Sequence, residues 1–468
     1  MKQIVTPEIM KQAEEGAFKN GLDPKDAMER AGTFVFDEVK NYKKVLVVCF
    51  SGNNGGDGFV CAEKLNSVGV PVHVLLLGNT EKLSDHAGFF YNNIKELIIQ
   101  TPDNDYDCIV DAVFGIGFKG ELTGEVLKTV EFINSCKNKA KIVSVDIPSG
   151  LDGLTGEYKT AVNADVTVTF QAIKTGLIIN KGASVAGEIK VRDIGIPVPS
   201  IVQAVEEEDI SFPEIKKTAH KGTQGHIGVI AGSFGMEGAA MLASASSIKS
   251  GAGKVSLAVS EDIKSNFTLR APEVMLTLRS DEFIFDKDVV LFGCGIGRKE
   301  DNKKILEFLI ENCTCPLVID ADGLYFLTRE MLKRAKCEII LTPHMGEASR
   351  LFGVSINDLQ KNPINITKAF AYDTGTTVLL KSNYNLITNG NEVYISSFGC
   401  PAMATAGSGD VLAGIVASMA HIMPTNIEAS INASYLDGRA GNLAQKEKTP
   451  YGVTASDILN NIFKEIEL

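Results

Sequence analysis

Tryptophan is absent from this chain of 468 residues, aromatic residues make up only 7% of it, and no apolar run is long. A membrane-spanning helix needs about 20 consecutive apolar residues. The N-terminal stretch carries Glu8, Glu14 and Glu15 where a secretory signal would be apolar. Positive charge is also scarce, since 46 Lys and Arg oppose 58 Asp and Glu, for a net charge of −12. We therefore expect a cytoplasmic protein that has neither a membrane nor a nucleic acid as its partner.

The number of cysteines is odd, and their spacing does not match that of a metal site. The nine cysteines are scattered, none forms a Cys-x-x-Cys motif, and Cys313 and Cys315 are the closest pair. A disulfide framework uses an even number of cysteines, and a zinc site uses closely spaced pairs. We expect reduced thiols that are mostly packed inside the protein.

What the chain does have is glycine, 44 residues of it, and enough length for two domains. In the first half, apolar strands predicted at residues 44–50, 70–77, 108–114 and 141–147 alternate with helices predicted at 59–68 and 126–134. This alternation is typical of a parallel sheet covered by helices on both faces. We predict a doubly wound α/β domain over residues 1–205, with its ligands at the carboxyl ends of the strands.

The pattern lapses over residues 196–216, where prolines and an acidic run predict a linker. A second α/β series then predicts a domain over residues 216–468. Its strands are predicted at residues 227–231, 254–259, 289–292, 317–319, 339–341 and 377–380, and a hairpin turns at Asn389-Gly390. A helix of small residues between Ala239 and Ala252 packs either inside the chain or between subunits, and we expect a homo-oligomer.

The first glycine-rich segment, residues 52–58, follows a predicted strand and precedes a predicted helix. Glycines let the backbone come close to a ligand, and free N–H groups at a helix start attract anions. Two later strands end at Asp111 and at Asp146, the latter followed by Ser149, so a parallel sheet brings these groups to one rim. Residues 115–120 match Gly-x-Gly-x-x-Gly, a weak signal this far along the chain. Turn geometry alone is the alternative for any one of these glycines.

The second glycine-rich segment, residues 406–409, is followed by Asp410 at the start of a predicted helix. N–H groups for a phosphate and a carboxylate base for a proton are what phosphoryl transfer onto a hydroxyl requires. His344 follows a Thr-Pro pair at a strand end, and a helix-capping role is its alternative. Asp320 and Asp322 predict a strand-end turn near the site, with magnesium brought by a nucleotide rather than held by the protein.

The motifs of the first half resemble those of the NAD(P)H-hydrate epimerase domain, a Rossmann-like fold, over residues 1–200. The resemblance implies that Asp146 is catalytic and contacts the hydrated nicotinamide ring of the substrate. It implies a potassium ion ligated by Asn54, Asp111 and Ser149. It also implies that the hydrated dinucleotide is held by Asn53, Asn54, Gly55, Gly56, Asp57, Gly115, Ile116, Gly117, Phe118, Lys119 and Gly120.

The second half resembles the ribokinase-like ADP-dependent NAD(P)H-hydrate dehydratase over residues 216–466. The resemblance implies that Asp410 is the catalytic base and that Ala239, Gly295 and His344 contact the hydrate. ADP, with magnesium, would be held by Lys381, Ser382, Asn383, Tyr384, Asn385, Ala406, Gly407, Ser408 and Gly409. The chain departs from the family at Ser382, where glycine is usual, and at Asp437, where histidine is common, and we expect Asp437 to be peripheral.

Together these resemblances imply a bifunctional repair enzyme that epimerises hydrated NADH and NADPH and dehydrates the S form with ADP. One alternative is a kinase for a small alcohol with an N-terminal dinucleotide-binding regulatory module. A second, non-enzymatic alternative treats the first domain as a dinucleotide-binding or partner-binding module.

Overall fold

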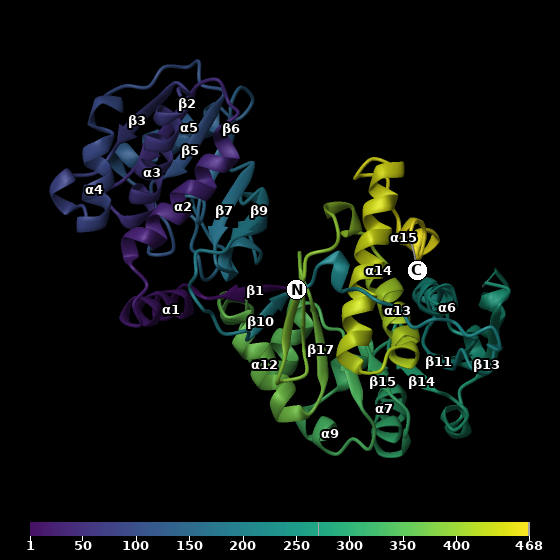
Figure 1. The fold of residues 1–468 in the computed structure, drawn as a ribbon. Helices are drawn as coiled ribbons and strands as arrows, with labels where there is room; N and C mark the ends of the chain where they lie inside the picture. The colour runs from purple at the N-terminus through teal and green to yellow at the C-terminus, as the bar shows by residue number, and fades with distance from the viewer. Residues whose placement is uncertain (270, 467–468) are drawn as a thin grey trace. The chain divides into compact units, whose positions relative to one another are not determined.

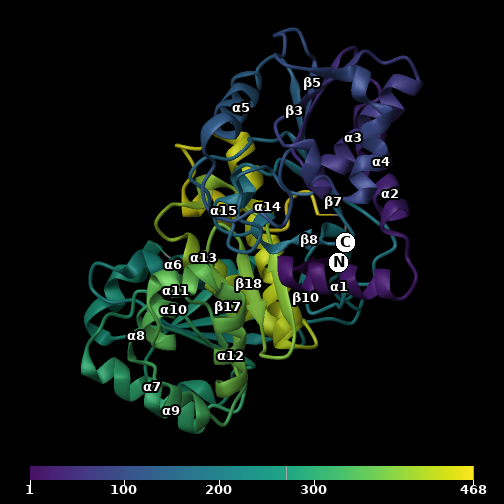
Figure 2. The same ribbon diagram turned by 90° about the vertical axis from the view of Figure 1, so that its left-hand side faces the viewer.

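The computed structural model describes residues 1–269 and 271–466. They form two compact units, one spanning Lys2–Ile201 and the other beginning at Val202 (Figures 1 and 2). Both units are α/β, which confirms the predicted fold class.

The first unit contains a sheet whose neighbouring strands are all parallel. The strand order is β4-β3-β2-β5-β6-β7-β9. Its elements are β1 (Lys2–Val5), α1 (Pro7–Lys19), α2 (Pro24–Val39), β2 (Val45–Cys49), α3 (Asn53–Ser67), β3 (Val72–Leu76), α4 (Asp85–Asn93), β4 (Ile98–Ile99), β5 (Cys108–Ala112), α5 (Gly124–Ser135), β6 (Lys141–Val145), β7 (Val166–Phe170), β8 (Ile173–Lys174) and β9 (Glu188–Arg192). Strands β1 and β8 pair separately, also in parallel.

Strand β2 shows why this sheet is covered on both faces. Val45 and Val47 belong to a core shared with α2 and α3, whereas Leu46 and Val48 belong to a core shared with α5. Alternate side chains of a strand point to opposite faces, so a strand that is apolar throughout needs cover on each side. The strand order reverses between β2 and β5, and the loops after these two strands diverge there. Such a switch point is where doubly wound sheets bind ligands.

The second unit has the strand order β13-β12-β11-β14-β15-β16-β17-β18-β19-β10, parallel except where β18 pairs with β17 and β19. Its strands are β10 (Val202–Ala204), β11 (His226–Ile230), β12 (Lys254–Val259), β13 (Val274–Leu278), β14 (Val289–Phe292), β15 (Leu317–Ile319), β16 (Ile339–Leu341), β17 (Thr377–Lys381), β18 (Asn385–Thr388) and β19 (Val393–Ser396). Its helices are α6 (Glu237–Lys249), α7 (Glu300–Asn312), α8 (Asp322–Phe326), α9 (Arg329–Lys333), α10 (Met345–Phe352), α11 (Ile356–Lys361), α12 (Pro363–Thr374), α13 (Ser408–Ile422), α14 (Asn426–Glu447) and α15 (Ala455–Asn461). The order reverses between β11 and β14.

Helix α6 is the predicted helix of small residues, and it packs inside the chain against α13. A Cβ on Gly414 of α13 would lie 2.0 Å from Ser246 Oγ and 2.2 Å from the Ala243 carbonyl oxygen. Small residues on both helices therefore allow the two backbones to approach closely. This packing matters for function because α13 begins at the second glycine-rich segment.

Three sequence-based expectations were wrong in detail. Helix α3 begins at Asn53 rather than at residue 59, so the first glycine-rich segment is the helix's own first turns. The expected linker contains β10, which pairs with β19 and belongs to the second unit. Strand β13 was not predicted, and Met275 and Leu278 on it are exposed.

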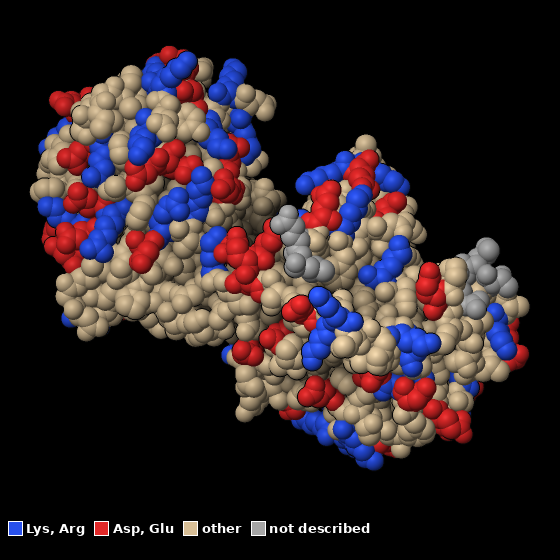
Figure 3. Space-filling model, turned by 45° about the vertical axis from the view of Figure 1, so that its right-hand side comes forward, with Lys and Arg blue, Asp and Glu red and all other residues tan. Residues whose placement is uncertain are grey.

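The cysteines and the surface agree with the composition. All nine cysteines are free. On the face shown in Figure 3, Lys and Arg are interspersed with Asp and Glu. Within the described residues, every helix is too short or too polar to cross a membrane.

Candidate active sites

The first candidate site is a cavity of about 670 Å³ at the switch point of the first unit. Its walls come from α1, α2 and α3, from the loop after β5, and from the end of β6. Of the residues predicted to hold the dinucleotide, those in the wall are Asn53, Asn54, Asp57, Gly115, Ile116, Gly117, Phe118 and Lys119. Gly55, Gly56 and Gly120 do not line it.

Asp146 lines this cavity and has an unusual backbone conformation. It follows β6 with a φ of 65°, a region that costs energy for a residue with a Cβ and often marks a functional position. Its Oδ1 lies 2.5 Å from Nζ of Lys174, which is 1% exposed. Lys174 also donates to Thr169 Oγ1 and to the Phe170 carbonyl oxygen, at 3.0 and 2.7 Å. The ammonium group of Lys174 is thus held by three oxygens, one of them from Asp146.

The glycines at the start of α3 serve packing. A Cβ on Gly55 would lie 1.9 Å from the Phe50 carbonyl oxygen, and one on Gly56 would lie 2.5 Å from Met28 Sδ. Their lack of side chains lets the first turns of α3 approach β2 and α2 closely. Gly115 lies against polar side chains rather than against the backbone of another element. A Cβ on Gly115 would be 3.2 Å from Asn54 Oδ1 and 3.3 Å from Asp146 Oδ2.

Asp111, in β5, and Ser149, in the loop after β6, are in contact and do not line this cavity. Asp111 is fully buried and accepts from Ser149 Oγ at 2.5 Å, Ser149 N at 2.8 Å and Ser144 Oγ at 2.9 Å. Burial raises the pKa of Asp111, and these hydrogen bonds oppose that rise. Within the described residues, no Lys, Arg or His forms an ion pair with this carboxylate.

The second candidate site lies at the switch point of the second unit, after β11 and β14. Gly295, with a φ of 59°, follows β14, and a Cβ there would lie 2.8 Å from that of Ala239 on α6. Ser233, after β11, donates to the Gly295 carbonyl oxygen at 2.8 Å. The structure therefore brings Ala239 and Gly295 together, as expected for one binding surface.

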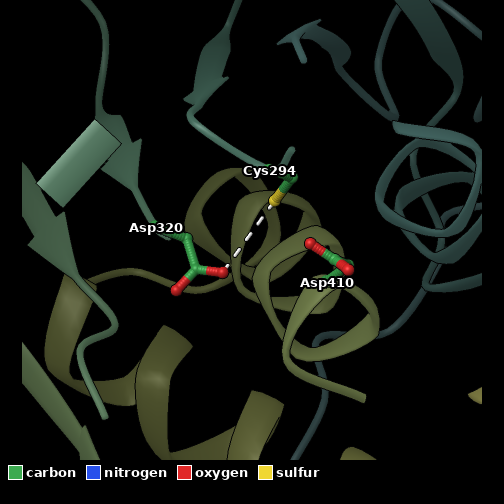
Figure 4. Close-up of side chains that lie close together, drawn as sticks. All are labelled: Cys294, Asp320 and Asp410. Carbon is green, nitrogen blue, oxygen red and sulfur yellow. Dashed lines mark hydrogen bonds between the residues drawn. The ribbon is translucent and has the colours of Figure 1, made fainter. Parts of the chain in front are cut away.

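Asp410 lies close to Cys294 and Asp320, which follow or end two neighbouring strands. Figure 4 shows Cys294 from the loop after β14, Asp320 from the end of β15, and Asp410 from the first turn of α13 pointing toward one another, with one ligand atom of each within 4.8 Å of the others. Burial, and next the charge of Asp320, raise the pKa of Asp410 to about 6, against the opposing effects of Cys294 and Lys381. The base is thus stronger than an ordinary aspartate.

Asp320 anchors this group of side chains. It is 1% exposed, and its Oδ1 accepts from Thr342 Oγ1 and from Lys381 Nζ, both at 2.8 Å. Lys381 Nζ also faces the glycine-rich segment, because a Cβ on Gly409 would lie 3.3 Å from it. Gly407 caps α13 with a φ of 90°, which a residue with a Cβ rarely adopts. An ammonium group and the free N–H groups of a helix start therefore converge beside Asp410.

His344 caps α10 and also borders this site. Its Nδ1 accepts from Gly346 N and Glu347 N, at 3.0 and 3.3 Å. The alternative role as a helix cap is therefore real, but the side chain is exposed and its Nε2 lies on the outside, 3.4 Å from a Glu347 oxygen. The backbone of His344 bridges to Lys381, so both residues lie at one strand edge.

Comparison with known proteins decides the family. The profile described as YjeF-related protein N-terminus matches residues 24–176, and that described as NAD(P)H-hydrate dehydratase matches residues 227–464. The whole chain is 32% identical to the bifunctional NAD(P)H-hydrate repair enzyme Nnr of Thermofilum pendens, of which 96% is covered. It is 35% identical to that of Archaeoglobus fulgidus, with 94% of each chain covered. The chain belongs to the bifunctional NAD(P)H-hydrate repair enzyme family.

A solved structure supports the fold of this family member's second unit. The ADP/ATP-dependent NAD(P)H-hydrate dehydratase of Bacillus subtilis, co-crystallised with ATP and Mg²⁺, is 29% identical, with a TM-score of 0.51. The match covers 57% of this chain and 99% of that one.

The remaining predicted nucleotide residues of this family member lie in and after the turn between β17 and β18. Ser382 Oγ donates to Asn383 Oδ1, and Asn385 Nδ2 donates to Ser434 Oγ. Tyr384 is buried and its hydroxyl has no partner among the described groups. Asp437, which the sequence predicts to be peripheral to the site, is buried on α14 with 4% of its surface exposed. Its burial leaves its role at the site a prediction.

The sequence did not predict two groups at these sites, and it predicted the place of a third without its main contact. Glu14 lines the first cavity, although α1 shows no motif. Cys294 lies between Asp320 and Asp410, and a cysteine in a glycine-rich loop carries no signal of its own. Asp320 was placed near the site by its position after a strand, but its contact with Lys381 depends on the pairing of strands far apart in sequence.

Proposed function

We propose that this chain is a bifunctional metabolite-repair enzyme. The first unit interconverts the R and S epimers of hydrated NADH and NADPH, and the second dehydrates the S epimer with ADP, giving AMP and phosphate. The observation that carries the proposal is the presence in one chain of two strand-end sites, one with Asp146 beside Lys174 and one with Asp410 beside a phosphate-binding helix start. The family of the chain agrees with both activities.

In the second site, we assign Asp410 as the base that removes the proton of the misplaced hydroxyl group. The hydroxyl oxygen then attacks the terminal phosphorus of ADP, and the N–H groups from Gly407 to Gly409 with Lys381 Nζ stabilise the transferred charge. Loss of phosphate and of a neighbouring proton restores the reduced ring. Magnesium bound to the nucleotide would neutralise phosphate charge, and Asp410 and Asp320 would be the carboxylates available to it.

In the first site, Asp146 takes up and returns the proton of the ring hydroxyl. The potassium ion fits the residues present, because Asp111 is a buried carboxylate without a cationic partner among the described residues. Asn54, Asp111 and Ser149 would hold the ion through oxygen atoms, the donors that a hard cation prefers. The ion would supply positive charge beside the loops after β5 and β6.

One spectroscopic experiment tests the proposed function. Acid-hydrated NADH, a mixture of both epimers, is incubated with the full chain and ADP, and the absorbance of the reduced ring is followed. We expect recovery of all the material, with AMP as the nucleotide product. A stable phosphorylated alcohol with no recovery of the reduced ring would support the kinase alternative instead.

A second experiment tests the potassium ion. Replacing K⁺ with Li⁺ should slow interconversion of the separated epimers measured without ADP, and should largely spare dehydration of the S epimer. Equal loss of both activities would contradict the assignment of the ion to Asn54, Asp111 and Ser149.

The proposal also includes a cytoplasmic location and a homo-oligomer. Nine free cysteines suit a reducing compartment. Size-exclusion chromatography with light scattering tests the oligomer, and a monomer at working concentration would remove that part.

A further inference from the structure

The first cavity contains a carboxyl group that the chemistry above does not use. Glu14 lies on α1 and lines the cavity together with Asp57, Asp146 and Lys174. On a helix, residues three and four apart share a face, so Glu14 lies on the same stripe as Met10 and Ala17, which are both buried. An ionisable residue on the apolar stripe of a helix is unusual unless it is paired. Glu14 has no ion-pair partner among the described residues.

The charges around Glu14 favour its protonated form. Burial, and next the negative charge of Asp146, raise the pKa of Glu14 from 4.5 to about 7, against the opposing effect of Lys174. The other charged groups that face it are Glu15 and Lys11 on its own helix and Asp57 on α3, whose own pKa burial holds well above its usual value. His86 and Lys119 line the same cavity.

The carboxyl groups of Asp146 and Glu14 therefore have different surroundings, as the members of a catalytic acid–base pair do. Asp146 Oδ1 lies 2.5 Å from the ammonium nitrogen of the buried Lys174, whereas Glu14, on a helix face with the buried Met10 and Ala17, has no cationic partner among the described residues. Two carboxyl groups in one cavity, one paired with a buried cation and the other unpaired, are suited to act as base and acid.

We propose, on the basis of the function proposed above, that Glu14 is a second catalytic residue of the epimerase site and donates a proton to the ring nitrogen while Asp146 accepts one from the ring hydroxyl. As the O–H proton moves to Asp146, the bond between the hydrated carbon and the ring nitrogen breaks. Its electron pair goes to the nitrogen, which takes the Glu14 proton. The products are an aldehyde and an N–H group within one molecule.

Rotation about the carbon–carbon bond beside the aldehyde presents its other face to the nitrogen. The nitrogen attacks the carbonyl carbon, Glu14 takes back the N–H proton, and Asp146 returns its proton to the oxygen. Both carboxyl groups end as they began, and no oxidant, reductant or water is consumed. Each residue acts as acid in one direction and base in the other, as an epimerisation requires.

The test measures interconversion of the separated R and S epimers by proton NMR, with the full chain and without ADP, so that dehydration is silent. Wild-type chain must accelerate interconversion, and its failure to do so would refute the proposed function rather than the role of Glu14. We expect E14Q to lower kcat on the order of 10²–10⁴-fold, and E8Q, at an exposed glutamate in the first turn of the same helix, to leave it unchanged.

Two further readouts separate catalysis from folding or binding. Dehydration of the S epimer with ADP by the E14Q chain should equal that of wild type, which shows that the chain is intact. The wild-type rate should fall as pH rises through about 7, where Glu14 loses its proton, and E14Q should lack this fall. An E14Q chain with unchanged kcat, with a change in KM alone, or with the same fall at high pH would overturn the proposal.

Discussion

Asp410 combines three properties that a general base at neutral pH needs. It is the third residue of α13, so the N–H groups of the helix start lie beside it. Burial and Asp320 raise its pKa to about 6, close to the working pH, without reaching it. The ammonium group of Lys381 lies between Asp320 and the glycine-rich segment. Its positive charge offsets part of the negative charge of Asp320 near Asp410.

We expect D410N to bind ADP as wild type does and to lose dehydration by about 10²–10⁴-fold, because the change removes the base and keeps the shape of the side chain. Calorimetry measures ADP binding, and recovery of the reduced-ring absorbance from the S epimer measures turnover. D301N, an exposed aspartate in the first turn of α7, is the matched control and should change neither. Full turnover by D410N would show that another group removes the proton.

Asp437 raises a question of stability at the scale of a single residue. It is buried on α14, its Oδ1 has no hydrogen-bond partner among the described groups, and burial raises its pKa from 3.8 to about 7, with Lys381 opposing. A carboxyl group whose pKa is higher in the folded state binds its proton more tightly there. Folding stability therefore falls as pH rises from about 4 to about 7, and the full penalty is present above that.

D437N should remove this penalty, because an amide of the same shape carries no charge to bury. The gap between 3.8 and about 7 corresponds to an upper value of roughly 4 kcal/mol. D437N should therefore be more stable than wild type at pH 8, by more than it is at pH 5. Hydrogen exchange of peptides from α14, measured in increasing urea, follows this unit alone. A D437N chain that is equally or less stable at pH 8 would show that the carboxylate is compensated in the folded state.

At the scale of helices and strands, apolar strands between turns could be predicted well. Strands β12, β14, β15 and β16 lie where the sequence predicts them, because each is a short apolar run between turn residues. The short β10 could not be predicted, because its place at the sheet edge depends on β19, which is far away in sequence. The start of α3 was missed because glycine has a low helix propensity. Tertiary packing against β2 and α2 outweighs that propensity at Gly55 and Gly56.

The candidate sites divide in the same way. Asp146 and Asp410 could be found because each follows a strand or begins a helix in a glycine-rich setting. Glu14 could not, because it comes from α1, and nothing in the sequence indicates that α1 lines the cavity after β2, β5 and β6. The ion pair of Asp320 with Lys381 requires that β15 and β17 flank β16 in the sheet. Motif reasoning finds groups on loops next to their own strands, and it misses groups supplied by other elements.

The contact between α6 and α13 gives a prediction at this scale. G414A places a Cβ 2.2 Å from the Ala243 carbonyl oxygen, which belongs to the backbone and cannot turn away. The helices must separate, at a cost of about 1–3 kcal/mol in the stability of the second unit. Because α13 carries Asp410, dehydration should fall while epimerisation is kept. G88A, a glycine inside α4 whose added Cβ would meet nothing within 4 Å, is the control. Wild-type dehydration and stability in G414A would show that the helices have room.

At the scale of the whole molecule, the two sites belong to separate units with separate cores. If the hydrated dinucleotide leaves one site and diffuses to the other, the two activities need not be in the same chain. A chain carrying D146N should then repair the S epimer rapidly and the R epimer only as fast as the two interconvert unaided. A chain carrying D410N should repair neither.

A mixture of these two full-length variants should therefore restore complete recovery from the mixed epimers. Each variant keeps one intact site, and the free epimers exchange between the chains through solution. The reduced-ring absorbance should rise in two phases with D146N alone. In the mixture the rate of the second phase should increase in proportion to the amount of D410N chain added. If the mixture recovers no faster than D146N alone while wild type recovers fully, the epimers are not exchanged between chains, and the fusion of the two units has a role in passing the substrate.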